Sequence, residues 1–225
     1  MRYILIYICK LKSWDIYFII KDMGKDIFVV LDLDNTLIYS IPMIKGFSKK
    51  EKFPKKKSYL HDMKYHKMNN DFIVFERPNL QKFLSWLFKN FNVMVWSAAS
   101  PDYVEFIVKN IIEKKNRKIE YVLNSNNCED SQKIFGDKHI KNLKLLWDIH
   151  DLPLGPHTTL IIDDLKMVTG IQPHNAIQIK SFNTNRSTCQ DDCELEYIKK
   201  RLIDVRKNFN KNIEKPNFKL VPSRA

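Results

Sequence analysis

The sequence has few residues of the kinds that mark common cofactor sites and disulfide scaffolds. It contains five glycines among 225 residues, and no GxGxxG segment, the fingerprint of dinucleotide binding. Its four cysteines show neither the CxxC spacing of a zinc site nor the density of a disulfide scaffold. This use of cysteine is typical of a reducing intracellular compartment, the cytoplasm or the nucleus. No apolar run is long and uncharged enough to predict a membrane span.

Length and composition predict one packed domain. A chain of 225 residues with 44% hydrophobic side chains can bury one sizeable core. We assign this domain to residues 23–210, with a lysine-rich insertion near 41–71 and a tail at 211–225. Residues 1–22 form an extension without a small-residue cleavage site, which argues against a signal peptide. Its part in the functional protein stays open, since Met23 is an alternative start.

The formal net charge of +12 predicts attraction to an anionic partner, whether a phosphoprotein, a nucleic acid or a membrane surface. Seven lysines lie between Lys45 and Lys57 and concentrate part of this charge. One interpretation of the run is a solvated loop that keeps the protein soluble. The other is a docking surface for an acidic or multiply phosphorylated protein segment. The sequence leaves both interpretations open.

Strand and helix patterns alternate along the chain. Apolar, β-branched runs predict strands at 27–31, 72–75, 93–96, 121–123, 159–162 and 176–179. Apolar residues at helical spacing predict helices at 78–88, 100–112, 143–147 and 191–207. This alternation predicts an α/β, Rossmann-like fold, with a parallel sheet, helices on both faces and a small insertion after the first strand. In that architecture ligands bind at the carboxyl ends of the strands.

Two carboxylates, Asp32 and Asp34, follow the first predicted strand directly. Side chains alternate along an extended segment, so both can face one crevice, where like charges repel unless a cation or a shared proton compensates them. A phosphoryl-transfer site supplies both, with one aspartate as nucleophile, the other as proton carrier and a divalent metal between them. The alternative is an acidic turn after a strand, with Asn35 and Thr36 as turn and helix-cap residues.

Three further polar sites follow in an order that favours the catalytic interpretation. Ser97 and the pair Asp163 and Asp164 each lie just past a predicted strand, and Lys141 lies in a polar stretch before a predicted helix. Individually they are commonly a turn residue, a solvated turn and a surface lysine. Together they offer a hydroxyl and an ammonium for phosphoryl oxygens and acids to hold magnesium.

These motifs resemble those of the haloacid-dehalogenase superfamily. Within it, the chain is similar to the RNA polymerase II C-terminal-domain phosphatases, the NLI-interacting-factor-like family. The resemblance covers roughly residues 26–205, and several ordered motifs carry it. They are Asp32-Leu33-Asp34-Asn35-Thr36, Glu76-Arg77-Pro78, Trp96-Ser97-Ala98-Ala99-Ser100-Pro101-Asp102-Tyr103, Lys141-Asn142-Leu143 and Thr159-Leu160-Ile161-Ile162-Asp163-Asp164.

The resemblance implies a haloacid-dehalogenase type fold and a role for each matching residue. Asp32 is then the nucleophile, and Asp34 is the acid that protonates the leaving oxygen and the base that activates water. Ser97 binds the phosphoryl group, although a threonine is more usual there. Lys141 neutralises charge on the phosphoaspartate, with Lys144 as the alternative because Asn142 replaces the usual aspartate beside it.

The resemblance also implies Mg²⁺ as the cofactor. Its expected ligands are the carboxylates of Asp32, Asp163 and Asp164 and the backbone carbonyl of Asp34. We further expect Thr36 and Arg77 to assist Ser97 and Lys141 in binding the phosphate or the substrate. The acid and base roles require the site to raise the pKa of Asp34.

The sequence therefore predicts a magnesium-dependent protein serine/threonine phosphatase, with RNA polymerase C-terminal repeats as one candidate substrate. The absence of a large lid-like insertion favours a phosphorylated protein over an enclosed metabolite. A phosphatase of a metabolite or of a nucleic-acid end is the enzymatic alternative. A two-component receiver domain is disfavoured, because its acidic pair opens the chain and its phosphorylated aspartate comes later. The third alternative is a catalytically silent basic binding module, against which the intact pair Asp32 and Asp34 argues.

Overall fold

A computed structural model describes residues 27–43, 53, 55–69, 71–147, 152 and 154–211 of the chain. The predicted extension 1–22 and most of the tail lie outside the described residues. So do the lysines from Lys45 to Lys52, while Lys57 is described and exposed. The two interpretations of the lysine run therefore both remain predictions. Among the described residues, no helix is both long and apolar enough to cross a membrane.

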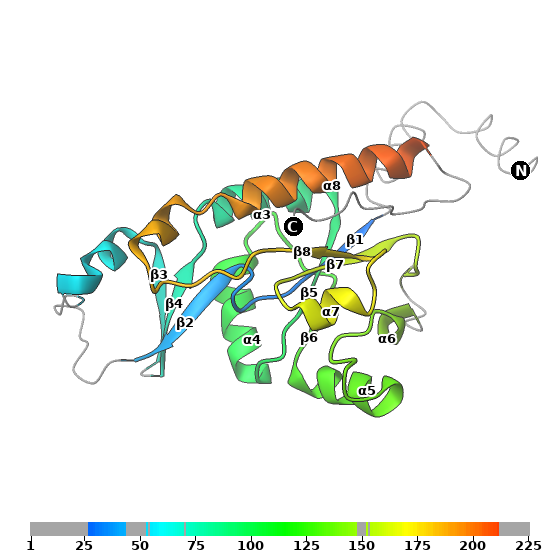
Figure 1. Cartoon of the computed structure of the whole chain (residues 1–225), viewed down its shortest axis with the longest axis horizontal. Helices are drawn as coiled ribbons and strands as arrows, with labels where there is room; N and C mark the ends of the chain where they lie inside the picture. Colours follow the sequence, from blue (N-terminus) through cyan, green and yellow to red (C-terminus); the bar gives the residue numbers. More distant parts are fainter. Residues whose placement is uncertain are drawn as a thin grey trace, which may run out of the picture.

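Five parallel strands form the central sheet, as the sequence predicts (Figure 1). Their order is β6 (Tyr121–Leu123), β5 (Asn92–Trp96), β1 (Phe28–Leu31), β7 (Thr159–Asp163) and β8 (Ala176–Gln178). The first strand lies at the centre, where Val30 is in register with Met94 on one side and with Ile161 on the other. Because all five strands run in one direction, their carboxyl ends share one edge of the sheet.

Helices cover both faces of this sheet. Val29 and Leu31 pack in one cluster with α3 (Leu80–Asn90), α4 (Pro101–Ile107) and α8 (Glu194–Lys211). Phe28 and Val30 point to the other face, toward α5 (Ser125–Phe135), α6 (Lys144–Trp147) and α7 (Lys166–Gly170). Alternate residues of a buried strand meet different layers, which is why the whole strand is apolar. A π-helical turn, η3 (Val108–Ile112), continues α4.

The insertion after the first strand contains structure that the sequence analysis did not predict. β2 (Ile38–Pro42), β4 (Phe72–Glu76) and β3 (Tyr65–Met68) form a separate antiparallel sheet. Two 3₁₀ helices, η2 (Lys55–Asp62) and η4 (Ser187–Asp191), accompany it. The segment 72–75 is thus a strand as expected, but it lies outside the parallel sheet. Figure 1 shows this smaller sheet beside the carboxyl ends of the central strands.

Candidate active site

Asp32 lies at the end of β1, in the middle of the sheet edge. Its backbone N–H donates to the carbonyl of Ile162 over 3.0 Å, which ties it to the neighbouring strand. The chain then turns sharply, with Asn35 in the left-handed region at φ 58°, a conformation that asparagine tolerates. Thr36 Oγ1 donates to Asp32 Oδ2 over 2.6 Å. The turn therefore fixes the orientation of the Asp32 carboxylate.

Lys141 brings a buried positive charge to this carboxylate. Its Nζ lies 2.5 Å from Asp32 Oδ1 and 2.8 Å from Asp163 Oδ2, and the residue is only 1% exposed. Burial disfavours the ammonium, but the two carboxylates outweigh this effect and raise the pKa of Lys141 above its ordinary value. Lys141 is therefore charged at neutral pH. It forms an ion-paired bridge between two strand ends.

The loop around Lys141 explains why it, and not Lys144, reaches the site. Gln172 Nε2 donates to the carbonyl of Lys141 over 2.8 Å and holds the loop against the sheet. The side chain of Asn142 accepts a hydrogen bond from the backbone N–H of Lys144 over 3.1 Å. It thus caps the start of α6, on which the Lys144 side chain is exposed.

Three carboxylates at the sheet edge form a candidate metal site. One oxygen each of Asp32, Asp163 and Asp164 lie within 4.8 Å of one another. Asp163 is fixed by the backbone N–H of Leu165, which donates to its Oδ1 over 2.8 Å. Burial and the charge of Asp32 raise the pKa of both Asp163 and Asp164. Three carboxylates beside the one ammonium of Lys141 leave an excess of negative charge, which favours a bound cation.

The donor set of this site fits Mg²⁺. All three ligands are carboxylate oxygens, which hard divalent cations prefer. The bonds from Lys141, Thr36 and Leu165 occupy part of the acceptor capacity of Asp32 and Asp163. Each carboxylate offers about four lone-pair positions, so both can still bind a cation.

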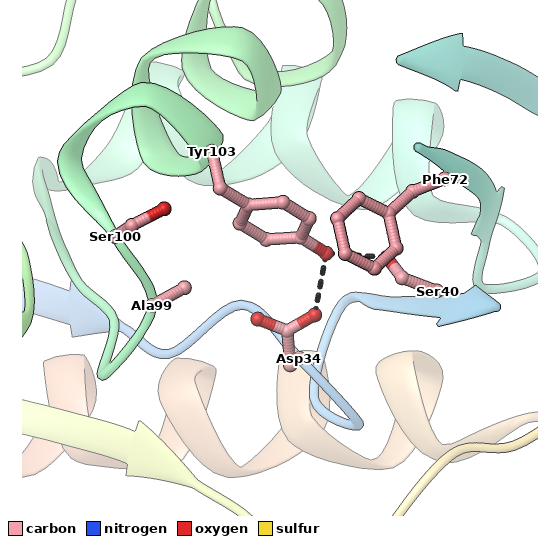
Figure 2. Close-up of a pocket in the computed structure, with 6 residues that line it drawn as sticks. All are labelled: Asp34, Ser40, Phe72, Ala99, Ser100 and Tyr103. Carbon is pink, nitrogen blue, oxygen red and sulfur yellow. Dashed lines mark hydrogen bonds between the residues drawn. The ribbon is translucent and has the colours of Figure 1, made fainter. Parts of the chain in front are cut away.

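Asp34 faces a different part of the cleft (Figure 2). Tyr103, from the first turn of α4, donates its phenol O–H to Asp34 Oδ1 over 2.6 Å, and the Ser40 hydroxyl contacts the same phenol oxygen. These residues line a pocket of about 310 Å³, together with Phe72, Ala99 and Ser100. Burial raises the pKa of Asp34; the bond from Tyr103 partly opposes this, and the charge of Asp32 adds to it. An aspartate with a raised pKa is suited to carry a proton.

Ser97 follows β5 and is 1% exposed. Its backbone N–H donates to the carbonyl of Leu123 over 3.1 Å, and its hydroxyl oxygen accepts the N–H of Ala99 over 3.0 Å. Those bonds fix the turn at the end of the strand. A serine hydroxyl also carries a donor hydrogen, which suits a phosphoryl oxygen.

Arg77 does not have the position expected of a substrate ligand. The residue is 1% exposed, and its guanidinium pairs with both carboxylate oxygens of Asp192, Nε to Oδ1 over 2.8 Å and Nη2 to Oδ2 over 2.9 Å. Its Nη1 and Nη2 also donate to the carbonyls of Thr36 and Lys180, each over 2.8 Å. Arg77 therefore supports the backbone behind Asp32. The Thr36 hydroxyl likewise donates its hydrogen to Asp32, so this hydrogen is not available to a phosphate.

Of the residues that line this pocket, only Asp34 was a predicted site residue; Tyr103, which bonds to Asp34, and Ser40, which bonds to Tyr103, were not predicted. Tyr103 belongs to the quoted motif that begins at Trp96, and its place in the first turn of the helix that follows this strand end was the available signal. Ser40 gave no such signal, because its strand was not predicted. Ser40 lies on β2 of the small sheet and Tyr103 on α4, and the two side chains meet where these elements pack together.

Comparisons with known proteins show which family and which proteins this chain is similar to. The family model of the NLI interacting factor-like phosphatases matches residues 27–213. The CTD phosphatase-like protein 355R of Invertebrate iridescent virus 3 is 38% identical over 189 residues, 80% of this chain and 96% of that protein. The protein of the same name from Invertebrate iridescent virus 6 is 37% identical over 179 residues, 78% and 95% of the two chains.

Among solved structures, the chain is similar to the fission yeast RNA polymerase II CTD phosphatase Fcp1 bound to beryllium fluoride. The TM-score is 0.54 and the identity 18%, which shows a shared fold. The match covers 95% of this chain but only 62% of the Fcp1 chain, less than two thirds of it. The haloacid-dehalogenase type fold expected from the motifs is thereby confirmed. On the family match and the viral relatives, this chain belongs to the NLI interacting factor-like phosphatase family.

Proposed function

We propose that this phosphatase hydrolyses phosphoserine or phosphothreonine in proteins, through a phosphoaspartate at Asp32 and with Mg²⁺ as cofactor. The observation that supports it most is the buried Lys141 ammonium, bonded to both Asp32 and Asp163 beside a third carboxylate. This arrangement gathers a nucleophile, a fixed positive charge and oxygen ligands for a cation. A catalytically silent module has no physical need for it.

The first half of the proposed reaction transfers the phosphoryl group to the enzyme. An oxygen of Asp32 attacks phosphorus, and the bond between phosphorus and the substrate oxygen breaks. Asp34, whose pKa is raised, gives its proton to that leaving oxygen. Lys141 and Ser97 provide donors for the phosphoryl oxygens.

The second half releases phosphate. Asp34, now ionised, takes a proton from water, and the water oxygen attacks the phosphorus of the phosphoaspartate. The acyl phosphate bond breaks and Asp32 is restored as a carboxylate. The carboxylates of Asp32, Asp163 and Asp164 and the carbonyl of Asp34 would hold Mg²⁺, which would supply positive charge to stabilise the phosphoryl oxygens.

The proposed substrate class rests on the pocket beside Asp34 and on the relatives. Phe72 and Tyr103 meet edge to face there, with ring centroids 5.7 Å apart, and offer an apolar wall for residues that flank a phosphorylated side chain. The viral relatives are named as CTD phosphatase-like proteins. We therefore propose RNA polymerase C-terminal repeats as a candidate substrate.

Phosphate release from an aryl phosphate tests the activity, and a substrate panel tests the class. We expect release that needs Mg²⁺, stops on chelation and is lost in Asp32→Asn but kept in Asp130→Asn, which changes an exposed acid on α5. On the panel, phosphoserine peptides should exceed sugar phosphates and 5′-phosphorylated oligonucleotides in kcat/KM. A higher kcat/KM for sugar phosphates or for 5′-phosphorylated oligonucleotides would contradict the proposed protein substrate.

A further inference from the structure

A second cluster of charged side chains lies away from the active site, where β3 and β4 meet the turn after η3. Glu76, at the end of β4, is buried and accepts hydrogen bonds from Lys64 and His66, each over 2.7 Å. Gln81 Nε2 donates to the same carboxylate over 3.0 Å. Gln81 Oε1 in turn accepts Arg117 Nη2 over 2.7 Å. A hydrogen-bonded chain thus joins the small sheet to the turn.

Arg117 is a member of this cluster with an unsatisfied hydrogen-bond donor. It is 5% exposed, and its buried Nη1 has no hydrogen-bond partner among the residues that the structure describes. A buried guanidinium donor without an acceptor is costly, and burial lowers the pKa of Arg117 although Glu76 opposes this. An oxyanion would supply the acceptor that Nη1 lacks.

Lys114 adds a second cation beside Arg117. The two residues close a tight turn, in which the Arg117 N–H donates to the Lys114 carbonyl over 2.8 Å and the reverse bond is 3.3 Å. Desolvation and the charges of Arg117 and Lys64 lower the pKa of Lys114. The nearby Glu113 carboxylate is engaged elsewhere, by the N–H of Ile119 over 3.1 Å.

The charges of this cluster do not balance. Three cations, Lys64, Lys114 and Arg117, are gathered near two carboxylates, those of Glu76 and Glu113, which leaves one positive charge in excess. Like charges at such short range repel, and a bound anion removes the repulsion. Because Lys64 and Lys114 are long and exposed, their ammonium groups can turn toward an anion at small cost.

We propose that Lys64, Lys114 and Arg117, named here the Arg117 cluster, bind a second phosphate of the substrate chain. This proposal rests on the proposed protein phosphatase function and specifies its substrate as a segment phosphorylated at two positions. Guanidinium and ammonium groups are the side chains that bind phosphate best. A phosphate held there is not hydrolysed, because the three carboxylates of the candidate metal site and the proton carrier Asp34 are not part of this cluster.

The length of the helical run between the two sites gives an estimate of the spacing of the two phosphates. The pocket beside Asp34 is lined by Phe72 and Tyr103, at the starts of β4 and α4. The Arg117 cluster lies at the other ends, next to Glu76 and just past η3. The helical run 101–112 spans about 18 Å at 1.5 Å per residue. An extended peptide covers that distance in about five residues, at about 3.4 Å each. We therefore expect the second phosphate about five residues from the one removed.

Binding to the non-hydrolysing Asp32→Asn variant tests this proposal separately from catalysis. Fluorescence anisotropy would compare peptides with one phosphoserine and with two, separated by two, five or nine residues. We expect the five-residue spacing to improve the Kd about tenfold over the single phosphoserine, as a charge-assisted contact does. Adding Lys114→Gln or Arg117→Gln should abolish that gain. Adding Lys133→Gln, which removes an exposed charge on α5, should keep it.

The outcomes separate the two proposals. If Lys114→Gln and Lys133→Gln retain the same gain, the Arg117 cluster does not bind the second phosphate. Since Lys114 is exposed, this comparison stands even where Arg117→Gln fails to fold. A single-stranded oligonucleotide that competes for the cluster better than the doubly phosphorylated peptide would also overturn the proposal. Failure of the proposed function instead appears as absent phosphate release by the unmodified protein.

Discussion

Tyr103 donates its phenol hydrogen to Asp34 Oδ1 over 2.6 Å. This bond fixes the orientation of the Asp34 carboxylate, the proposed proton carrier, through one of its two oxygens. Tyr103 reaches it from α4, while Asp34 lies in the turn after β1 (Figure 2). The bond leaves the second oxygen of Asp34 for the reacting groups. It also opposes burial, which raises the pKa of Asp34. Tyr103 is therefore a positioning residue whose loss should change the pH dependence of the reaction.

Tyr103→Phe should move the rising limb of the kcat profile to higher pH. Removing a contact that lowers the pKa of Asp34 raises that pKa, so the base form needed to activate water appears only at higher pH. The profile would be measured with an aryl phosphate. Tyr121→Phe, at an exposed tyrosine of β6, is the matched control. Identical profiles for both variants would show that Tyr103 does not act on Asp34.

Lys141→Met should lower kcat by about 100-fold or more, since a fixed charge at the reacting group is lost. The variant also leaves Asp32 and Asp163 facing each other without the ammonium that bonds both. Lys144→Met removes the same group from an exposed neighbouring position and should retain activity. A larger loss in the Lys144 variant would assign the role to Lys144 instead.

Mg²⁺ should raise the melting temperature of the protein, because a ligand that binds only the folded state stabilises it. Asp164→Asn should shift the midpoint of this titration to higher Mg²⁺ concentration, since Asp164 supplies one of three clustered carboxylates. The titration needs no substrate and so reports binding alone. Asp130→Asn is the control with the same charge change on α5. If both variants titrate alike, Asp164 is not a ligand.

Glu76 should make stability depend on pH. Burial raises its pKa, but hydrogen bonds from His66, Lys64 and Gln81 outweigh burial and lower the pKa below its ordinary value of 4.5. A carboxylate with a depressed folded pKa contributes stability that is present above its unfolded pKa and is lost as the pH falls through the folded value.

Glu76→Gln should therefore cost about 1–2 kcal/mol in the free energy of unfolding near neutral pH. The difference from the unmodified protein should shrink as the pH is lowered below 4.5. Urea unfolding at several pH values would measure it, with Glu129→Gln at an exposed position of α5 as the control. A difference that stays constant over this range would exclude an electrostatic origin.

The sequence could predict which candidate site residues share one edge of the sheet, because these residues follow or end strands. Asp32, Ser97 and Asp163 each follow or end an apolar strand, and parallel strands bring such residues to one edge without further information. The choice between Lys141 and its alternative Lys144 depends on contacts that the sequence does not show, those of Gln172 with the Lys141 carbonyl and of the Asn142 cap with Lys144.

The parts that the sequence analysis missed depend on polar segments and on contacts distant in sequence. β2 and β3 have the sequences IYSIP and YHKM, neither of which contains a long apolar run, and both strands pair with β4. Helix α5 buries only Cys128 and Ser131, too few for a helical pattern. Arg77 pairs with Asp192, 115 residues away, so its motif could not reveal that it supports the backbone.

The phosphoaspartate at Asp32 is tested most directly by trapping it. In Asp34→Asn, the base that activates water is absent, while an aryl phosphate still transfers its phosphoryl group because its leaving oxygen needs little protonation. Acid-quenched protein should then carry the mass of one phosphoryl group, placed on Asp32 by peptide mapping and removed by hydroxylamine. A label on another residue, or an Asp32→Asn variant that turns over at the unmodified rate, would contradict the mechanism.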